Sequence, residues 1–287
     1  MAIDSDLLRK RVERLEGLPT LPSVASKLIS MTQSLKTSAT EVGELISKDQ
    51  ALTTRVLKLV NSAYYGFPKQ ITTVNHAVVI LGFSRVKNIV LAASVFGIKS
   101  GKGPQRFDAV AFWRHCLGTA VCARTLSKEL HRGEQEEAFV CGLLHDIGKV
   151  VLAQVSPGEY DQALELAEQK SCLIRDAEME VFGLDHAEVG SWLVERWKLP
   201  PGVQTAIQRH HSPRDTRKDR DTAFVVHLAD IFARGLQVGS GGDPGIPLID
   251  DAVVRDLGIN SDHFPVLIPK MVEDLKRSAE FFDMIEG

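Results

Sequence analysis

Apolar residues recur every three or four positions along most of this 287-residue chain, and strand-like alternation is nearly absent. Such spacing is typical of amphipathic helices that bury one face. Ser38 and Glu41 form a capping-box pattern that predicts a helix over 39–47. Asp49 is placed to cap a second helix over about 50–64. The first part of the chain is therefore predicted to be a bundle of short helices.

The helical pattern continues to the end of the chain. We predict further helices near 73–81, 84–96, 107–131, 135–154, 157–170, 173–181, 185–197, 201–210, 220–236 and 262–283. Prolines make 18–22 a stiff extended segment. The Gly- and Pro-containing segment 99–104 is the best boundary, and 239–245 reads as a flexible loop. The fold class is predicted to be all-α, with an N-terminal helical bundle over 1–98 and a larger helical bundle over 105–287.

The composition is that of an ordinary globular protein, with 44% hydrophobic and 25% charged residues. A net charge of −3 gives no sign of bulk nucleic-acid binding. The four cysteines form no CxxC pair and are interpreted as buried, reduced thiols. The charged N-terminus does not resemble a signal peptide, and the apolar run 89–98 is shorter than the ~20 residues a membrane span needs. We expect a cytoplasmic protein that does not contact membranes.

Imidazole and carboxylate groups recur on the apolar helices of the second half. They are His115, His145, Asp146, His186, His210, His211 and Asp230. Such groups are the usual ligands of Fe, Mn and Zn, and a carboxylate beside a histidine can bridge two ions. The set predicts two divalent transition metals that share Asp146, with Fe or Mn favoured and Zn or Ni as alternatives. Two ions about 3.5–4 Å apart suit phosphoester hydrolysis.

Each group also has a simpler structural interpretation, which the sequence leaves open. His115 can be a hydrogen-bonded core histidine. His145 and Asp146 can be a buried hydrogen-bonded pair, because the apolar run before them does not tolerate an unpaired carboxylate. His210 and His211 can complement the C-terminus of a helix.

Neighbouring positions carry similar alternatives. Lys149 lies one turn beyond the His-Asp pair, so its ammonium can reach an anion bound at the metals or can be solvated. His186 follows a candidate N-cap, Asp185, and its alternative is a surface histidine at a helix start. His227 shares a helix face with Asp230 and is interpreted as a residue that does not bind metal.

The order His…His-Asp…His…His-His…Asp resembles the HD superfamily of metal-dependent phosphohydrolases, and the HDIGK motif at 145–149 resembles its HD-GYP branch of cyclic-di-GMP phosphodiesterases. This resemblance implies catalytic roles for Asp146 and Lys149. It implies one metal held by His115, His145, Asp146 and Asp230, and a second held by Asp146, His186, His210 and His211. The chain departs from HD-GYP proteins after His211, where it reads Ser-Pro-Arg-Asp-Thr without Asp-Gly-x-Gly-Tyr-Pro, and at Ala111, where many carry glutamate.

The first half resembles a narrower family, the HDOD domain or HD-related output domain. The similar segments are LPTLPSV at 18–24, ISKDQAL at 46–52, VNSAYY at 60–65 and ITTVNHAVVILG at 71–82. This resemblance implies an all-α bacterial signalling protein, usually a non-enzymatic output module that acts on a protein partner. We therefore expect a signal-transduction output or interaction module with an intact dinuclear centre. The alternative is an active phosphohydrolase on a nucleotide, a cyclic dinucleotide or a related phosphoester.

Overall fold

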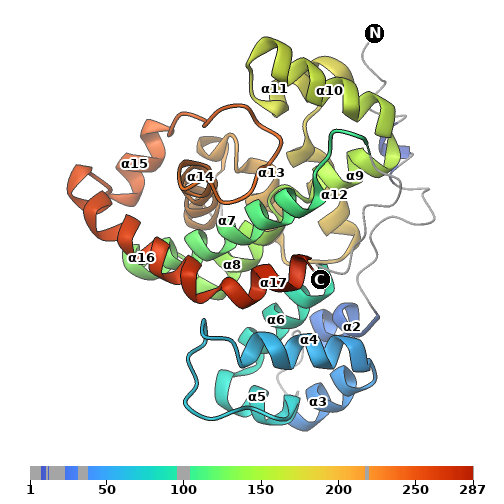
Figure 1. The fold of residues 1–287 in the computed structure, drawn as a ribbon, viewed down its shortest axis with the longest axis vertical. Coiled ribbons are helices and arrows are strands. Elements are labelled where there is room, and N and C mark those ends of the chain that lie inside the picture. Colours follow the sequence, from blue (N-terminus) through green and yellow to red (C-terminus); the bar gives the residue numbers. More distant parts are fainter. Residues whose placement is uncertain are drawn as a thin grey trace. The chain divides into compact units, whose positions relative to one another are not determined.

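The computed structural model describes residues 8–10, 12, 23–31, 38–95, 104–216 and 220–286. Helices and connecting loops make up these described ranges, which contain no strand (Figure 1). The predicted all-α fold class is confirmed. The proline-rich segment 18–22 and most of the predicted boundary 99–104 lie outside the described residues.

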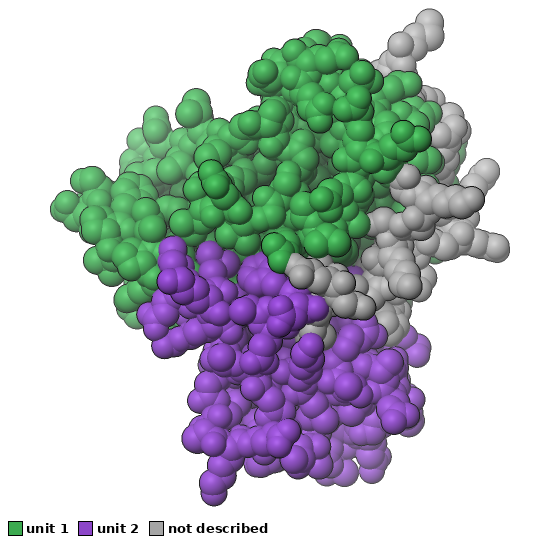
Figure 2. Space-filling model, in the orientation of Figure 1, with its two compact units in different colours: residues 1–19, 100–271 green, residues 20–99, 272–287 purple. Residues whose placement is uncertain are grey.

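Contacts divide the chain into two compact units (Figure 2). Unit 1 comprises 1–19 and 100–271, and unit 2 comprises 20–99 and 272–287. The units differ from the predicted division at both ends of the chain, where 1–19 group with unit 1 and 272–287 with unit 2.

Unit 2 is built from short helices, three of which, α3, α4 and α5, have a side-chain cap at the N-terminus. Its helices include α2 (Ser23–Met31), α3 (Ala39–Ser47), α4 (Gln50–Val60), α5 (Val74–Leu81), α6 (Phe83–Val95) and α17 (Ala279–Glu286). The predicted capping box at α3 is present, and Asp49 Oδ1 accepts a hydrogen bond from the Leu52 amide at 2.9 Å. Helix α4 ends earlier than predicted because the Asn61 amide group bonds the carbonyls of Leu57 and Ile71 and the Ile71 N–H.

Unit 1 is arranged around the long helix α7, which packs against two neighbours, α8 and α14. Its helices include α7 (Ala109–Leu130), α8 (Gln135–Leu144), α9 (Ile147–Val155), α10 (Pro157–Lys170), α11 (Ile174–Phe182), α12 (His186–Arg196), α13 (Pro201–Arg209), α14 (Arg220–Gly235) and α15 (Asp251–Leu257). A short 3₁₀ turn, η1 (Pro213–Asp215), follows α13. The predicted apolar face of α7 is buried, including Phe112, Leu117, Val121 and Leu126.

Two predicted helices are interrupted in the structure. The helix expected over 135–154 divides into α8 and α9 at the His145-Asp146 turn. The helix expected over 262–283 divides into α16 (Phe264–Arg277) and α17 around Ser278, whose amide and hydroxyl both bond the Leu275 carbonyl.

Gln135–Val155 is long and apolar enough to cross a membrane, but 89% of that window is buried inside the protein, as in the core helices of globular proteins.

Candidate metal centre

The His145-Asp146 turn places both side chains in the centre of unit 1. His145 ends α8 and Asp146 precedes α9, and both are fully buried. The Nδ1 of His145 donates a hydrogen bond to the Gly142 carbonyl at 2.7 Å. This bond fixes the ring and directs Nε2 toward the neighbouring carboxylates of Asp146 and Asp230.

One group of side chains gathers around the Oδ2 atom of Asp146. His145 Nε2 lies 3.3 Å from this oxygen, and His115 Nε2 from α7 lies 3.6 Å from it. Asp230 on α14 completes the group, because its Oδ1 lies 3.0 Å from His115 Nε2 and 3.6 Å from His145 Nε2. Three predicted ligands, His115, His145 and Asp146, therefore lie close enough together to hold one ion, and Asp230 adjoins the two histidines.

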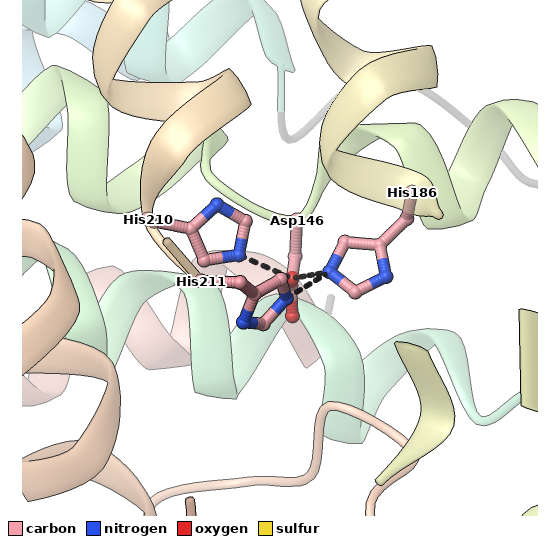
Figure 3. Close-up of side chains that lie close together, drawn as sticks. All are labelled: Asp146, His186, His210 and His211. Carbon is pink, nitrogen blue, oxygen red and sulfur yellow. Dashed lines mark hydrogen bonds and ion pairs between the residues drawn. The ribbon is translucent and has the colours of Figure 1, made fainter. Parts of the chain in front are cut away.

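A second group gathers around the other oxygen of Asp146, as Figure 3 shows. His186 Nε2 lies 2.9 Å from Asp146 Oδ1, and His210 Nε2 lies 3.7 Å from it. His211 Nε2 lies 2.8 Å from His186 Nε2. Each oxygen of one carboxylate thus faces its own set of imidazoles, which is the geometry of a carboxylate that bridges two ions.

A glycine brings the two helices of the second group together. A Cβ atom on Gly148 of α9 would lie 1.9 Å from the carbonyl oxygen of His186 and 2.7 Å from the amide of Gly190, both on α12. Only a residue without a side chain allows this backbone contact. The contact places His186 against Asp146, with Asp185 capping the start of α12 as predicted.

The donor set fits a metal better than it fits a hydrogen-bonded cluster. His145 Nε2, His210 Nε2, both nitrogens of His115 and Asp146 Oδ1 are buried without a hydrogen bond among the described residues. Short separations such as the 3.0 Å between His115 and Asp230 lack hydrogen-bond geometry. Buried polar atoms left unsatisfied cost free energy, whereas metal coordination satisfies several at once.

The buried charges also favour a bound cation. Four buried carboxylates, on Asp146, Glu178, Asp230 and Asp243, face two buried cations, Lys149 and Arg234. When the imidazoles are neutral, as they must be to bind a metal, two negative charges are uncompensated, which favours bound divalent cations.

The pKa values of the histidines respond to this excess charge. Burial lowers the pKa of His145, but the carboxylate of Asp146 outweighs burial and raises it to about 9. Burial likewise lowers the pKa of His186, yet Glu178 and Asp146 raise it to about 9. Burial dominates at His210, whose pKa is held well below its ordinary value. A centre without metal therefore attracts protons, which a metal ion would replace.

Lys149 is not a solvated lysine. Its side chain is fully buried, and its ammonium donates to Asp146 Oδ2 at 2.8 Å and to the Gly241 carbonyl at 2.7 Å. Burial lowers the pKa of Lys149, but Asp146 and Asp243 raise it above its ordinary value. The ammonium therefore stays charged beside the centre.

His227 is engaged away from the centre, in agreement with its interpretation as a residue that does not bind metal. Its Nδ1 donates to the His210 carbonyl at 2.8 Å, and its Nε2 accepts from the Asp250 amide at 3.2 Å. Both ring nitrogens are used, so His227 supports the backbone that carries the His210-His211 pair.

Sequence reasoning missed three buried charged residues around the centre. Glu178 Oε2 accepts from His186 Nδ1 at 2.6 Å and from the His186 amide at 2.8 Å. Arg234 donates to Asp230 Oδ1 at 2.7 Å and pairs with Asp243. Glu178 was detectable, since it occupies an apolar-face position of α11 four residues from both Ile174 and Phe182. Asp243 was hidden in a glycine-rich segment that predicted only flexibility.

An all-α protein with histidines and carboxylates gathered at a His-Asp turn is consistent with the predicted resemblance to the HD superfamily. Comparison with protein families narrows this class, because the HDOD domain family matches residues 18–213. The chain therefore belongs to the HDOD family, and the predicted resemblance is confirmed.

Known proteins and structures are similar to this chain over most of its length. An HDOD domain protein of unknown function from Geobacter sulfurreducens is 25% identical, with a TM-score of 0.77 over 98% of this chain and 97% of that one. A Shewanella amazonensis SB2B protein, provisionally named a phosphohydrolase, is 27% identical, with a TM-score of 0.76 over 97% of each chain. An uncharacterized protein of Treponema pallidum (strain Nichols) is 28% identical over 228 residues, and the match covers 78% of this chain but only 44% of that relative.

Proposed function

We propose that this chain is an HDOD signalling module, an output or interaction domain, that holds a dinuclear metal centre in unit 1. The observation that carries the proposal is the position of Asp146. Its two oxygens face separate groups of imidazoles, and several of those nitrogens are buried without hydrogen bonds among the described residues. A buried arrangement of this kind is costly unless cations occupy it.

In this proposal each ion has four protein ligands. The first would be held by His115, His145, Asp146 and Asp230, and the second by Asp146, His186, His210 and His211. Mixed nitrogen and oxygen ligands favour Fe or Mn, with Zn or Ni as alternatives. Such ions would supply Lewis-acid chemistry toward a phosphoryl oxygen.

The signalling role rests on what surrounds the metals. The Asp-Gly-x-Gly-Tyr-Pro segment typical of HD-GYP phosphodiesterases is absent, and Ser212 and η1 follow His211 instead. Lys149, the group best placed to bind a phosphate, is already bonded to Asp146 and to the Gly241 carbonyl. A centre in this state supports a structural or sensory role, read out by a protein partner.

A second function is favoured by the completeness of the site. All seven predicted ligands and Lys149 lie together, which is the equipment of a phosphohydrolase on a nucleotide or cyclic dinucleotide. In that reaction Lys149 would hold a phosphoryl oxygen through its charged ammonium.

Elemental analysis followed by an activity screen tests the proposal and separates the two functions. Protein should be purified once in air and once without oxygen. Each preparation should contain two bound transition-metal ions per chain. The same samples should hydrolyse none of a panel of nucleotides and cyclic dinucleotides. Metal-free protein would overturn the dinuclear centre, and efficient turnover of any panel member would overturn the signalling assignment in favour of the hydrolase.

Glu178 should control how tightly the second ion is held. Replacing it with glutamine removes the negative charge that orients and polarises His186 but preserves the size of the side chain. We expect metal affinity to fall about 10–100-fold, measured by competition with a chromophoric chelator. Glu180→Gln is the matched control, because Glu180 lies on the same helix in an exposed pair with Lys170. Equal affinities in the two variants would contradict this role.

A further inference from the structure

Residues 238–243, here called the strap, lie across the centre after α14. The Val238 amide donates to the Ala233 carbonyl at 3.0 Å, and the Ser240 amide donates to the Ala111 carbonyl at 2.9 Å. The strap is thus tied to the end of α14 and to the first turn of α7. The flexible loop predicted over 239–245 is instead bonded to the protein along this first part.

The backbone of Gly241 lies directly against the centre. A Cβ atom at this position would be 3.2 Å from Asp146 Oδ2, from His115 Cδ2 and from Lys149 Nζ. These separations are tight even for a single methyl carbon, so no other group fits between the strap and these atoms. The strap therefore closes the side of the centre that Lys149 faces.

Asp243 at the end of the strap is held as a bound anion would be. Its side chain is only 3% exposed. Its Oδ1 accepts from the Ile174 amide at the start of α11 at 2.8 Å, and its Oδ2 lies 3.5 Å from Lys149 Nζ. Arg234, with a side chain only 7% exposed, pairs with the same Oδ2. Two cations and a backbone N–H around one oxygen pair are the contacts that proteins use for phosphate.

The cations around Asp243 offer one hydrogen-bond donor more than its carboxylate uses, which suits a larger anion. Arg234 Nη2 is buried and has no hydrogen-bond partner among the residues that the structure describes. Burial raises the pKa of Asp243, but Lys149 and Arg234 hold it below its ordinary value, so the carboxylate is charged. A carboxylate has two oxygens, whereas a phosphoryl group has a third that could reach the unused donor.

We propose that Asp243 is an internal anion that occupies a phosphoryl-binding subsite formed by Lys149 and Arg234, and that the strap must withdraw before a phosphate-bearing ligand reaches the centre. The purpose of this subsite rests on the proposed function. The subsite itself does not, because its two cations, Lys149 and Arg234, are side chains of the protein. The strap thus keeps the module closed, and a phosphorylated ligand opens it.

Binding of inorganic phosphate, measured by isothermal titration calorimetry, tests the proposal. Asp243→Asn preserves the size of the side chain and an oxygen acceptor for the Ile174 amide but removes the competing charge. Because a closed strap reduces apparent affinity by the fraction of open protein, we expect the variant to bind phosphate at least about tenfold more tightly than the wild type. Asp262→Asn, an exposed position in η2 (Ser261–His263), is the matched control and should bind as the wild type does.

A second substitution locates the bound phosphate. Adding Lys149→Met to Asp243→Asn should abolish the gain in affinity. Equal affinity in wild type and Asp243→Asn, or a gain that survives Lys149→Met, would overturn the proposal. Titrations of metal-free and metal-loaded protein separate this proposal from the dinuclear centre. A protein that binds no metal counts against the dinuclear centre. An Asp243→Asn variant that binds phosphate no more tightly than the wild type counts against closure by the strap.

If Asp243→Asn does not fold, hydrogen exchange of the wild-type protein tests whether phosphate releases the strap. Phosphate that displaces Asp243 should release the strap and speed exchange of the Val238 and Ser240 amides, compared with chloride at equal ionic strength. Unchanged exchange at these two amides would overturn the proposal.

Discussion

Replacing Asp146 with alanine should leave the purified protein without either metal ion. Each oxygen of this carboxylate faces a different group of histidines, so one substitution removes a ligand from both ions. The change also leaves the buried ammonium of Lys149 without its nearest carboxylate. We expect the free energy of unfolding to fall by about 3–5 kcal/mol, as when one partner of a buried ion pair is removed. Elemental analysis and chemical denaturation measure the two effects.

Two further variants separate metal loss from general damage. Asp146→Asn preserves the volume of the side chain, so it should fold and still lose both ions, because the neutral amide bridges poorly. Asp256→Ala on α15 removes an exposed aspartate that pairs with Arg220, and should retain wild-type metal content. Full metal content in Asp146→Ala would show that this carboxylate does not bridge the ions.

Replacing Gly148 with alanine should be among the most damaging single-methyl additions in the chain. The new Cβ would meet backbone atoms of α12, which cannot rotate away as a side chain can. We expect a loss of more than about 3 kcal/mol of unfolding free energy, or failure to fold, from overpacking against a rigid neighbour. In any folded fraction α12 must move away from α9, which carries His186 away from Asp146 and weakens metal binding. Thermal unfolding and elemental analysis report these effects.

Gly158 provides the matched control for this substitution. It lies in the first turn of α10, and a Cβ atom there would meet nothing within 4 Å. Gly158→Ala should therefore be neutral or slightly stabilising, because alanine restricts the unfolded chain. A Gly148→Ala protein as stable as Gly158→Ala would show that α9 and α12 do not make the close contact described above.

The helices of this protein were largely predictable because their signals are local. A capping box, an N-cap aspartate or a repeating apolar face acts within one or two turns. Ser38, Asp49 and Asp185 each cap the helix that the sequence predicted for them. The predictions that failed include the breaks at His145-Asp146 and Ser278 and the early end of α4, where the Asn61 side chain bonds Ile71, ten residues away.

The candidate site was predictable only in part. The histidines and aspartates stand out because such groups are unusual in apolar helices. Glu178 follows the same rule and could have been found from its place on the apolar face of α11. Asp243 could not, since a glycine-rich loop carries no periodicity that says which way it faces.

By itself, the sequence determined that this protein is all-α, that it belongs to the HDOD family and that it retains a full set of potential metal ligands. Only the tertiary structure decided that Asp146 turns one oxygen toward each group of histidines, that Lys149 is buried and that the strap closes over it. The physical reason is distance along the chain. A residue's ligand chemistry and a helix cap depend only on that residue and its neighbours in the sequence. Lys149 and the Gly241 carbonyl, by contrast, are 92 residues apart and meet only in the folded chain.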